Sequence, residues 1–384
     1  MLSNNQEAFL AMLRAGLWEQ KVRLSKSEDI DFYVISRLAE EQAVVGLIAA
    51  GIEHLEDVKV PQGLVLQLVG TTLQIEKQNT SMNTFIATLM EKVSSEGIYA
   101  LLVKGQGVAQ CYERPLWRTS GDVDLVMDEL NYEAAKSYFK TICHEEGIEI
   151  NNRLHIDYTI GSWVVELHGS LRNGLWDRMD KGIDQALHNS LSSENERLWN
   201  CNGTAIRLPL VDDDIIFVFT HILQHFFRNG IGMRQICDWC RLIWKYKDSL
   251  NHSLLESRIR NMRILTEWRA FAALAVYHLG MPKEYMPLFD SSLKYKNKGD
   301  RILSLIFHTG NLGHSRGLDY YKKYPYSIAK IISLYKNSQY SIKQIGIFPV
   351  DSIRGWWKMI VTGIYFLVRK IRMIKKHRDR FSVS

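Results

Sequence analysis

Two short apolar segments that both run into polar residues constrain the fold of this chain more than any other feature. The first, Ala100 to Lys104, is followed by Gly105, and the second covers residues 122–127 and begins with Asp122 and Asp124 around a valine. Both have the length and composition of β-strands, and the glycine predicts a turn. Because side chains alternate across a strand, the two aspartates should project from the same face. The pattern therefore predicts two carboxylates side by side, on the strand that follows a glycine turn.

This pair of carboxylates points to a chemistry. Two adjacent carboxylates repel each other, so such a pair usually shares a cation, and ligands that are all oxygen suit Mg²⁺. Gly105 has no Cβ, so the backbone at the turn can approach a phosphate closely, and a helix that starts there would offer free N–H groups. The simplest alternative is two solvated aspartates at the start of a strand, because a Gly-Asp-x-Asp string is not specific by itself.

The same residues resemble the nucleotidyltransferase superfamily that includes DNA polymerase beta and kanamycin nucleotidyltransferase. The signature of that superfamily is a glycine turn followed, after a gap, by Asp-x-Asp on the next strand. The form in this chain, Lys104-Gly105 and then Arg-x-x-Gly-Asp-x-Asp-Leu-Val at residues 118–126, is most similar to a bacterial branch of uncharacterised nucleotidyltransferases. The resemblance is sharp over residues 98–170. It departs from the usual Gly-Ser or Gly-Gly pair, because Gln106 follows the glycine here.

The resemblance implies a fold, an activity and a set of site residues. The fold would be α+β, with a small mixed-sheet core and predominantly helical N- and C-terminal regions. Superfamily members carry a third acidic residue on a neighbouring strand, and this role falls to Glu166, in a Glu-Leu-His string. Catalysis and the binding of Mg²⁺, for which Mn²⁺ could substitute, would then rest on Asp122, Asp124 and Glu166. The residues expected to contact the nucleotide are Lys104, Gly105, Gln106, Arg118 and Gly121.

Three polar residues on the later strands have more than one interpretation. Alternation places His168 on the same face as Glu166, where it could orient that carboxylate, contact the substrate, act as a base or be purely structural. His155 and Asp157 share a face of the preceding strand, and either could line the pocket without a catalytic role.

Two pairs on the helices that follow are equally open. Arg234 and Asp238 resemble an Arg-x-x-x-Asp element of the related branch and could contact a substrate phosphate, or they could form an ion pair within one helix. His221 and His225 are four residues apart, a spacing that could bind a metal, yet no acidic ligand stands with them. One or both could instead face the active-site cleft.

The distribution of charge argues against a nucleic-acid partner. The chain of 384 residues has a net charge of +6, and residues 369–380 supply all of it through seven basic residues and one acidic residue. The remainder is neutral, whereas a protein that binds polynucleotides usually carries a basic face on its body. The expected partners are therefore a nucleoside triphosphate and a small-molecule or protein acceptor.

Compartment and membrane contact are suggested by the cysteines and by the two ends of the sequence. Five scattered cysteines and a polar N-terminus without a secretory signal favour a reducing cytoplasm. The apolar segment at 356–368 is too short to span a bilayer. With the basic run behind it, this segment could lie on an anionic membrane surface, or it could pack on the body as a last helix.

Hydrophobic periodicity divides the chain into four regions. These are an N-terminal helical region at 1–96, the nucleotidyltransferase core at 97–210, a helical domain at 211–350 and an amphipathic basic tail at 351–384. A glycine-rich loop at 310–317 could close over a ligand or be a flexible surface loop. Beyond the segments already named, strands are expected at 153–160, 163–168 and 204–210, and helices at 63–96, 106–114, 131–144, 233–247, 254–280, 299–308 and 326–337.

Nucleotidyl transfer is the function that the resemblance implies: an acceptor oxygen attacks the α-phosphorus of ATP or another triphosphate, and pyrophosphate leaves. Three alternatives stay open at this point. The chain could bind nucleotides as a regulatory module without turnover, it could transfer AMP to another protein, or it could be a scaffold that binds neither metal nor triphosphate. The sequence identifies neither the nucleotide nor the acceptor.

Overall fold

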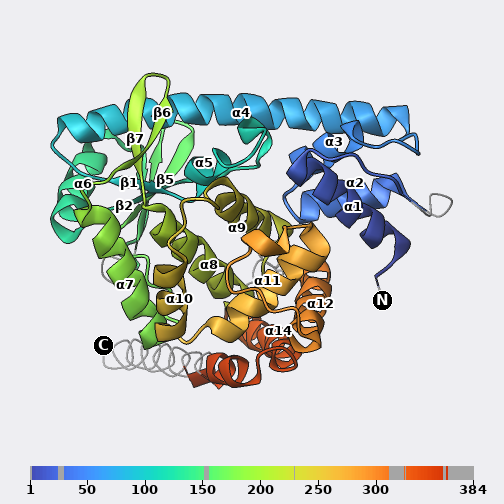
Figure 1. The fold of residues 1–384 in the computed structure, drawn as a ribbon. Helices are drawn as coiled ribbons and strands as arrows, with labels where there is room; N and C mark the ends of the chain where they lie inside the picture. The colour runs from blue at the N-terminus through green and yellow to red at the C-terminus, as the bar shows by residue number, and fades with distance from the viewer. Residues whose placement is uncertain are drawn as a thin grey trace, which may run out of the picture.

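The computed structural model describes residues 2–24, 30–150, 155–228, 230–310, 324, 326–357 and 360–361. The longest element is helix α4 (Gln62–Ser95), which runs from the N-terminal helices to the β-sheet (Figure 1). Its 34 residues give it a length of about 50 Å. The helix begins after Pro61 and ends before Gly97, which has a φ of 72°. It therefore matches the helix predicted at 63–96.

Five strands form one mixed sheet in the order β1-β2-β5-β4-β3. The neighbours β2 and β5 run parallel, and the other neighbouring pairs run antiparallel. The aspartates that precede and follow Val123 therefore lie next to the strand of Glu166, and the α+β fold class is confirmed. The strands are β1 (Leu101–Val103), β2 (Val123–Val126), β3 (Glu145–Glu146), β4 (Ile156–Ile160) and β5 (Trp163–His168).

One face of the sheet packs against α4 and α6 (Glu129–Ile142). Met82 and Met90 of α4 and Phe139 of α6 are buried in the same hydrophobic cluster as Leu125 of β2 and Leu167 of β5. Because alternate residues of a strand project to opposite faces, the polar residues between these apolar ones project away from the cluster. The opposite face of the sheet therefore carries the acidic residues.

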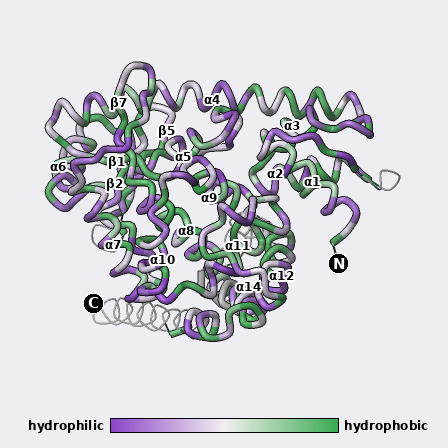
Figure 2. Tube along the Cα trace, viewed as in Figure 1, coloured by the Kyte–Doolittle hydropathy of each residue, from purple (hydrophilic) through white to green (hydrophobic). Residues whose placement is uncertain are grey.

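The helices of the N- and C-terminal regions pack on each other. They share one hydrophobic cluster, and the Trp18 indole Nε1 donates a hydrogen bond of 2.6 Å to the carbonyl oxygen of Leu279. Figure 2 shows hydrophobic stretches in β1, β2 and α8, in the interior of the molecule. The division into four domains stays a prediction. The helices are α1 (Asn4–Trp18), α2 (Phe32–Glu41), α3 (Val45–Glu53), α8 (Val211–Arg228), α9 (Met233–Lys245), α10 (His252–Asn261), α11 (Leu265–Leu279), α12 (Leu293–Thr309) and α14 (Tyr326–Ile345).

Some local predictions differ from the structure. The helix expected at 106–114 is the shorter α5 (Gly105–Ala109), and a 3₁₀ helix, η2 (Pro115–Trp117), follows a few residues later. Arg114 is not helical, because proline disfavours helical backbone in the preceding residue. The helix expected at 254–280 is divided into α10 and α11 at Arg263, whose φ is 56°. The prediction also lacked α7 (Asp177–Ser192), the short strand β3, and β6 (Arg197–Cys201), which forms a hairpin with β7 (Thr204–Leu208).

Three predicted features lie wholly or largely outside the described residues, namely the glycine-rich loop beyond Gly310, the apolar segment at 356–368 and the basic run at 369–380. In the part of the chain that the structure describes, no helix combines the length and the apolar character needed to cross a bilayer.

Candidate active site

A cavity of about 390 Å³ lies between the sheet, the turn after β1 and helices α8 and α9. It brings together residues that are far apart in the sequence, from Val103 to Asp238. All but one of the predicted site residues line it, and the exception is Gln106. The predicted residues that line the cavity are Lys104, Gly105, Arg118, Gly121, Asp122, Asp124, Glu166, His168, Arg234 and Asp238.

Asp124 is held by two basic side chains. The carboxylate is only 4% exposed, and its Oδ1 accepts hydrogen bonds from Lys104 Nζ at 2.9 Å and His168 Nε2 at 2.8 Å. Burial opposes ionisation, but these two partners outweigh it and hold the pKa of Asp124 well below its ordinary value. Asp124 is therefore ionised, and it forms part of the wall of the cavity.

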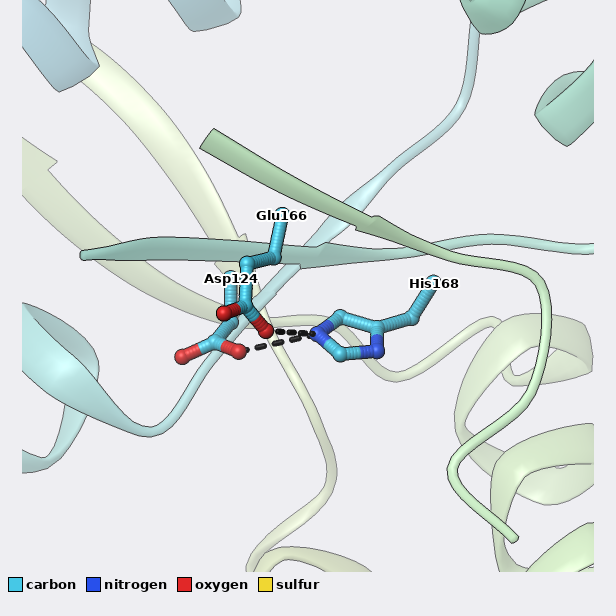
Figure 3. A group of neighbouring side chains, drawn as sticks. All are labelled: Asp124, Glu166 and His168. Atoms are coloured by element: carbon cyan, nitrogen blue, oxygen red, sulfur yellow. Dashed lines mark hydrogen bonds and ion pairs between the residues drawn. The ribbon is translucent and has the colours of Figure 1, made fainter. Parts of the chain in front are cut away.

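His168 bridges two carboxylates from adjacent strands. Figure 3 shows one ring nitrogen directed at both Asp124 and Glu166, and the distance from His168 Nε2 to Glu166 Oε2 is 3.4 Å. Burial lowers the pKa of His168, but the hydrogen bonds with Asp124 and Glu166 more than compensate, so the pKa is raised. Among the interpretations drawn from the sequence, this geometry matches a histidine that orients Glu166.

Asp122 lies in the loop just before β2 and is exposed to the cavity. The pKa of Asp122 is raised, chiefly by the negative charge of Asp124, while Lys104 and Arg234 partly offset this effect. The two aspartates are therefore close enough to oppose each other's ionisation. A cation between them would remove that opposition.

The turn after β1 has an unusual backbone. Lys104 has a φ of 56° and a ψ of −143°, and Gly105 follows with a φ of 38°. A residue with a side chain in this region costs about 1–3 kcal/mol, so its presence at a cavity is a sign of a functional constraint. Burial lowers the pKa of Lys104, but the charge of Asp124 and the hydrogen bond to it raise the pKa overall.

Gln106 has a different surrounding from the one expected. Its side chain is buried, and Nε2 donates a hydrogen bond of 2.7 Å to Oδ1 of Asn79 on α4. The amide of Asn79 in turn donates to the carbonyl oxygens of Leu116 and Arg118, both at 2.7 Å. Gln106 thus anchors the loop that leads to Asp122 and does not line the cavity.

Arg118 and Asp238 form a buried ion pair between the loop and α9. Nε and Nη2 of Arg118 donate to the two carboxylate oxygens of Asp238 at 2.7 and 2.8 Å. The Tyr112 hydroxyl donates to the same carboxylate at 2.7 Å. The charge of Arg118 is therefore already compensated, and Asp238 pairs with it and not with Arg234 on its own helix.

Arg234 retains hydrogen-bonding capacity at the cavity. Its Nη1 donates to the carbonyl oxygen of Thr119 at 2.9 Å, while its Nε is buried without a hydrogen-bond partner among the described residues. Burial and the neighbouring Arg118 lower the pKa of Arg234. Gly121 also lines the cavity, and a Cβ there would meet nothing within 4 Å. The guanidinium of Arg234 therefore keeps a free donor at the cavity among the described residues.

The histidine pair on α8 forms the opposite wall of the cavity. His221 and His225 both line it, with their Nε2 atoms 3.0 Å apart. Burial lowers the pKa of both, so they are neutral, and one ring donates to the other. The sequence spacing suggested that these residues could face the cleft.

Asn79 and Tyr112, which fix the loop and the ion pair, were not predicted, because nothing near them in the sequence signals these contacts.

The donor atoms at the cavity fit a divalent cation. One ligand atom from each of Asp124, Glu166 and His168 lies within 4.8 Å of the other two, and Asp122 lines the same cavity. The three carboxylates supply oxygen ligands, which Mg²⁺ prefers. The raised pKa of Asp122 reflects a local excess of negative charge, and the described residues offer only Lys104 and His168 as direct partners of Asp124 and Glu166.

Comparison with known proteins places the chain in a family. A family model described as an uncharacterised nucleotidyltransferase matches residues 28–280, more than half of the chain. No curated protein matches. Among solved structures, an antigenic nucleotidyltransferase-like protein from Paracoccidioides brasiliensis is 17% identical, with a TM-score of 0.32 over 52% of this chain and 92% of that one. The family match confirms the resemblance and the transferase class predicted from the glycine turn and the Asp-x-Asp strand. The chain belongs to the family of uncharacterised nucleotidyltransferases.

Proposed function

We propose that this protein transfers a nucleoside monophosphate from a nucleoside triphosphate to a hydroxyl or phosphate acceptor and releases pyrophosphate. The observation that carries the proposal is the register of two parallel strands, which pairs Asp124 of β2 with Glu166 of β5 on the face that borders the cavity. Asp122 and the turn at Lys104-Gly105 border the same space. Ligands for a cation, contacts for phosphate and a proton acceptor are thus available to one substrate.

Asp122, Asp124 and Glu166 would hold Mg²⁺, for which Mn²⁺ could substitute. When bound, such an ion would neutralise charge on the triphosphate and lower the pKa of the acceptor hydroxyl. Hydrogen bonds of the sheet fix the backbone of Asp124 and Glu166, so these ligands are preorganised, whereas Asp122 lies on a loop that is anchored through Asn79.

Lys104 and Arg234 would contact the phosphates. The ammonium group of Lys104 compensates Asp124, and a cation at that carboxylate would free it to neutralise the charge of the departing pyrophosphate. The Nε of Arg234, which has no hydrogen-bond partner among the residues that the structure describes, can add a charge-assisted hydrogen bond to a phosphate oxygen. The charge of Arg118 is engaged by Asp238, so we assign Arg118 to positioning of the loop before Asp122.

Glu166 would accept the proton of the acceptor oxygen. Its side chain is 26% exposed, compared with 4% for Asp124, so it is the carboxylate on the strands that a substrate can reach more easily. His168 would hold Glu166 in place through its ring nitrogen and prevent it from turning away from the cavity.

The test is a screen of the four α-labelled nucleoside triphosphates with Mg²⁺ or Mn²⁺, across hydroxyl, phosphate and protein acceptors, with pyrophosphate measured in the same samples. The expected result is α-label in the product, with one pyrophosphate released for each label transferred. Label on a protein acceptor would identify protein modification by AMP. Cation-dependent binding without any transfer would overturn catalysis in favour of a regulatory module, and transfer of the γ-phosphate would overturn the reaction type.

A further inference from the structure

The face of the sheet that borders the cavity carries a row of three carboxylates on three adjacent strands. The register pairs Asp124 of β2 with Glu166 of β5, and Glu166 with Asp157 of β4. Neighbouring strands are about 4.8 Å apart, and like charges directly opposite each other destabilise a sheet. Three acidic residues in one row therefore require compensation by cations or protons.

The basic partners in this row are unevenly distributed. Asp124 has Lys104 and His168 within 2.9 Å, and Glu166 has His168 at 3.4 Å. Asp157 has no ion pair with any described residue, and its Oδ1 is buried without a hydrogen-bond partner. A buried carboxylate oxygen without a partner costs free energy, and the described residues offer no positive partner at the β4 end of the row.

An imidazole lies next to this end of the row of carboxylates. His155 precedes β4, lines the cavity, and has its ring centroid 5.6 Å from that of His168. One ligand atom from each of His155, Asp157 and Glu166 lies within 4.8 Å of the other two. Metal–ligand distances in zinc sites are about 2.0–2.2 Å, so small rotations of these partly exposed side chains would gather the three atoms around one ion.

We propose that His155, Asp157 and Glu166 form a second metal site, specific for a divalent transition metal such as Zn²⁺ or Mn²⁺. One imidazole and two carboxylates are a mixed nitrogen and oxygen set, which suits these ions better than Mg²⁺. The ion supplies a positive charge to Asp157, which forms no ion pair with the described residues, and it separates Asp157 from Glu166. Water completes its coordination on the open side. Glu166 is the residue that this site shares with Asp122 and Asp124.

Metal binding by this site does not depend on nucleotidyl transfer, so the two are tested separately. Full-length protein is stripped with a chelator, dialysed against Zn²⁺ or Mn²⁺ without nucleotide, and its metal content is measured. We expect His155→Ala and Asp157→Asn each to lose one bound equivalent relative to the parent. His188→Ala, which removes an exposed histidine of α7, is the matched control and should retain the full amount.

Pulsed electron paramagnetic resonance of the Mn²⁺ form identifies the ligand directly. The parent should show coupling of Mn²⁺ to an imidazole nitrogen, and His155→Ala should lose that coupling while Asp122→Asn retains it.

The site is overturned if both His155→Ala and Asp157→Asn bind as much metal as the parent, or if the nitrogen coupling persists in His155→Ala. Asp157→Asn has nearly the same shape as the parent, so it decides the question even if His155→Ala fails to fold. If the parent transfers no nucleotide but the two variants still lose bound metal, the proposed function is contradicted and the second metal site stands.

Discussion

Two groups of charged side chains at the cavity, one centred on Asp238 of α9 and one on the sheet, differ in how their acids are compensated. On the helical side, Asp238 receives both donors of Arg118 and the hydroxyl of Tyr112, so its carboxylate is fully engaged within the protein. On the sheet side, Asp122, Asp124 and Glu166 share one lysine and one histidine. The first cluster is complete by itself, whereas the second has more negative charge than the described residues balance.

This difference separates structural from functional acids in the same cavity. A bidentate pair with Arg118 leaves Asp238 no capacity for a metal and gives it a role in joining the loop to α9. An acidic row with too few partners is costly for the free protein and becomes favourable when a cation binds. Proximity to the cavity is therefore a weaker sign of function than the balance of charge around each acid.

The largest effect on stability is expected when the complete cluster is broken. Asp238→Ala leaves the buried guanidinium of Arg118 without a counter-charge, which should lower the free energy of unfolding by about 3–5 kcal/mol. Denaturant titration measures this loss. Asp122→Asn, on the loop exposed to the cavity, is the control and should not destabilise the protein. A loss below about 1 kcal/mol for Asp238→Ala would mean that the ion pair is not structural.

The incomplete cluster should respond to added cation. A divalent ion at about one hundred times its dissociation constant stabilises the native state by about 2.7 kcal/mol, provided that it binds only the folded chain. We expect Mg²⁺ to raise the melting temperature of the parent and to have a much smaller effect on Asp124→Asn. Equal stabilisation of both proteins would place the bound ion elsewhere.

Another buried acid, Glu267, is neutralised by a proton. Burial and the neighbouring Asp351 raise the pKa of Glu267 to about 8 from an ordinary value of 4.5. The native state therefore retains a proton that the unfolded chain releases, and stability should fall as the pH rises from about 4.5 towards about 8, with a slope of at most about 1.4 kcal/mol per pH unit. Unfolding measured across this range should show a smaller slope for Glu267→Gln. An unchanged slope would assign the pH dependence to other groups.

The smallest effect should come from the outer part of the complete cluster. Tyr112→Phe removes one hydrogen bond to Asp238 but leaves the bidentate contact with Arg118 intact, so the loss should be about 1 kcal/mol. Denaturant titration of the single variants and of a double variant with Asp238→Ala measures whether the two contacts are coupled. Additive losses would show that the hydroxyl does not support the ion pair.

Local patterns predicted the sheet and most helices, because alternation and helical periodicity depend on neighbouring residues. The aspartates around Val123 and the facing Glu166 were likewise accessible from short strings and a resemblance. The sequence could not predict that Arg118 pairs with Asp238, since the two are 120 residues apart and no local pattern records their contact. The same holds for Gln106 and Asn79, and for the pairing of Asp157 with Glu166, which depends on the strand register.

Transfer of label from an α-labelled triphosphate, compared between the parent and Asp124→Asn at equal folded concentration, tests the central claim most directly. Loss of a carboxylate from a shared cation site removes several kcal/mol of transition-state stabilisation, so the variant should be slower by on the order of a thousandfold. Circular dichroism of both proteins controls for folding. A correctly folded Asp124→Asn that transfers label as fast as the parent would contradict catalysis at this cavity.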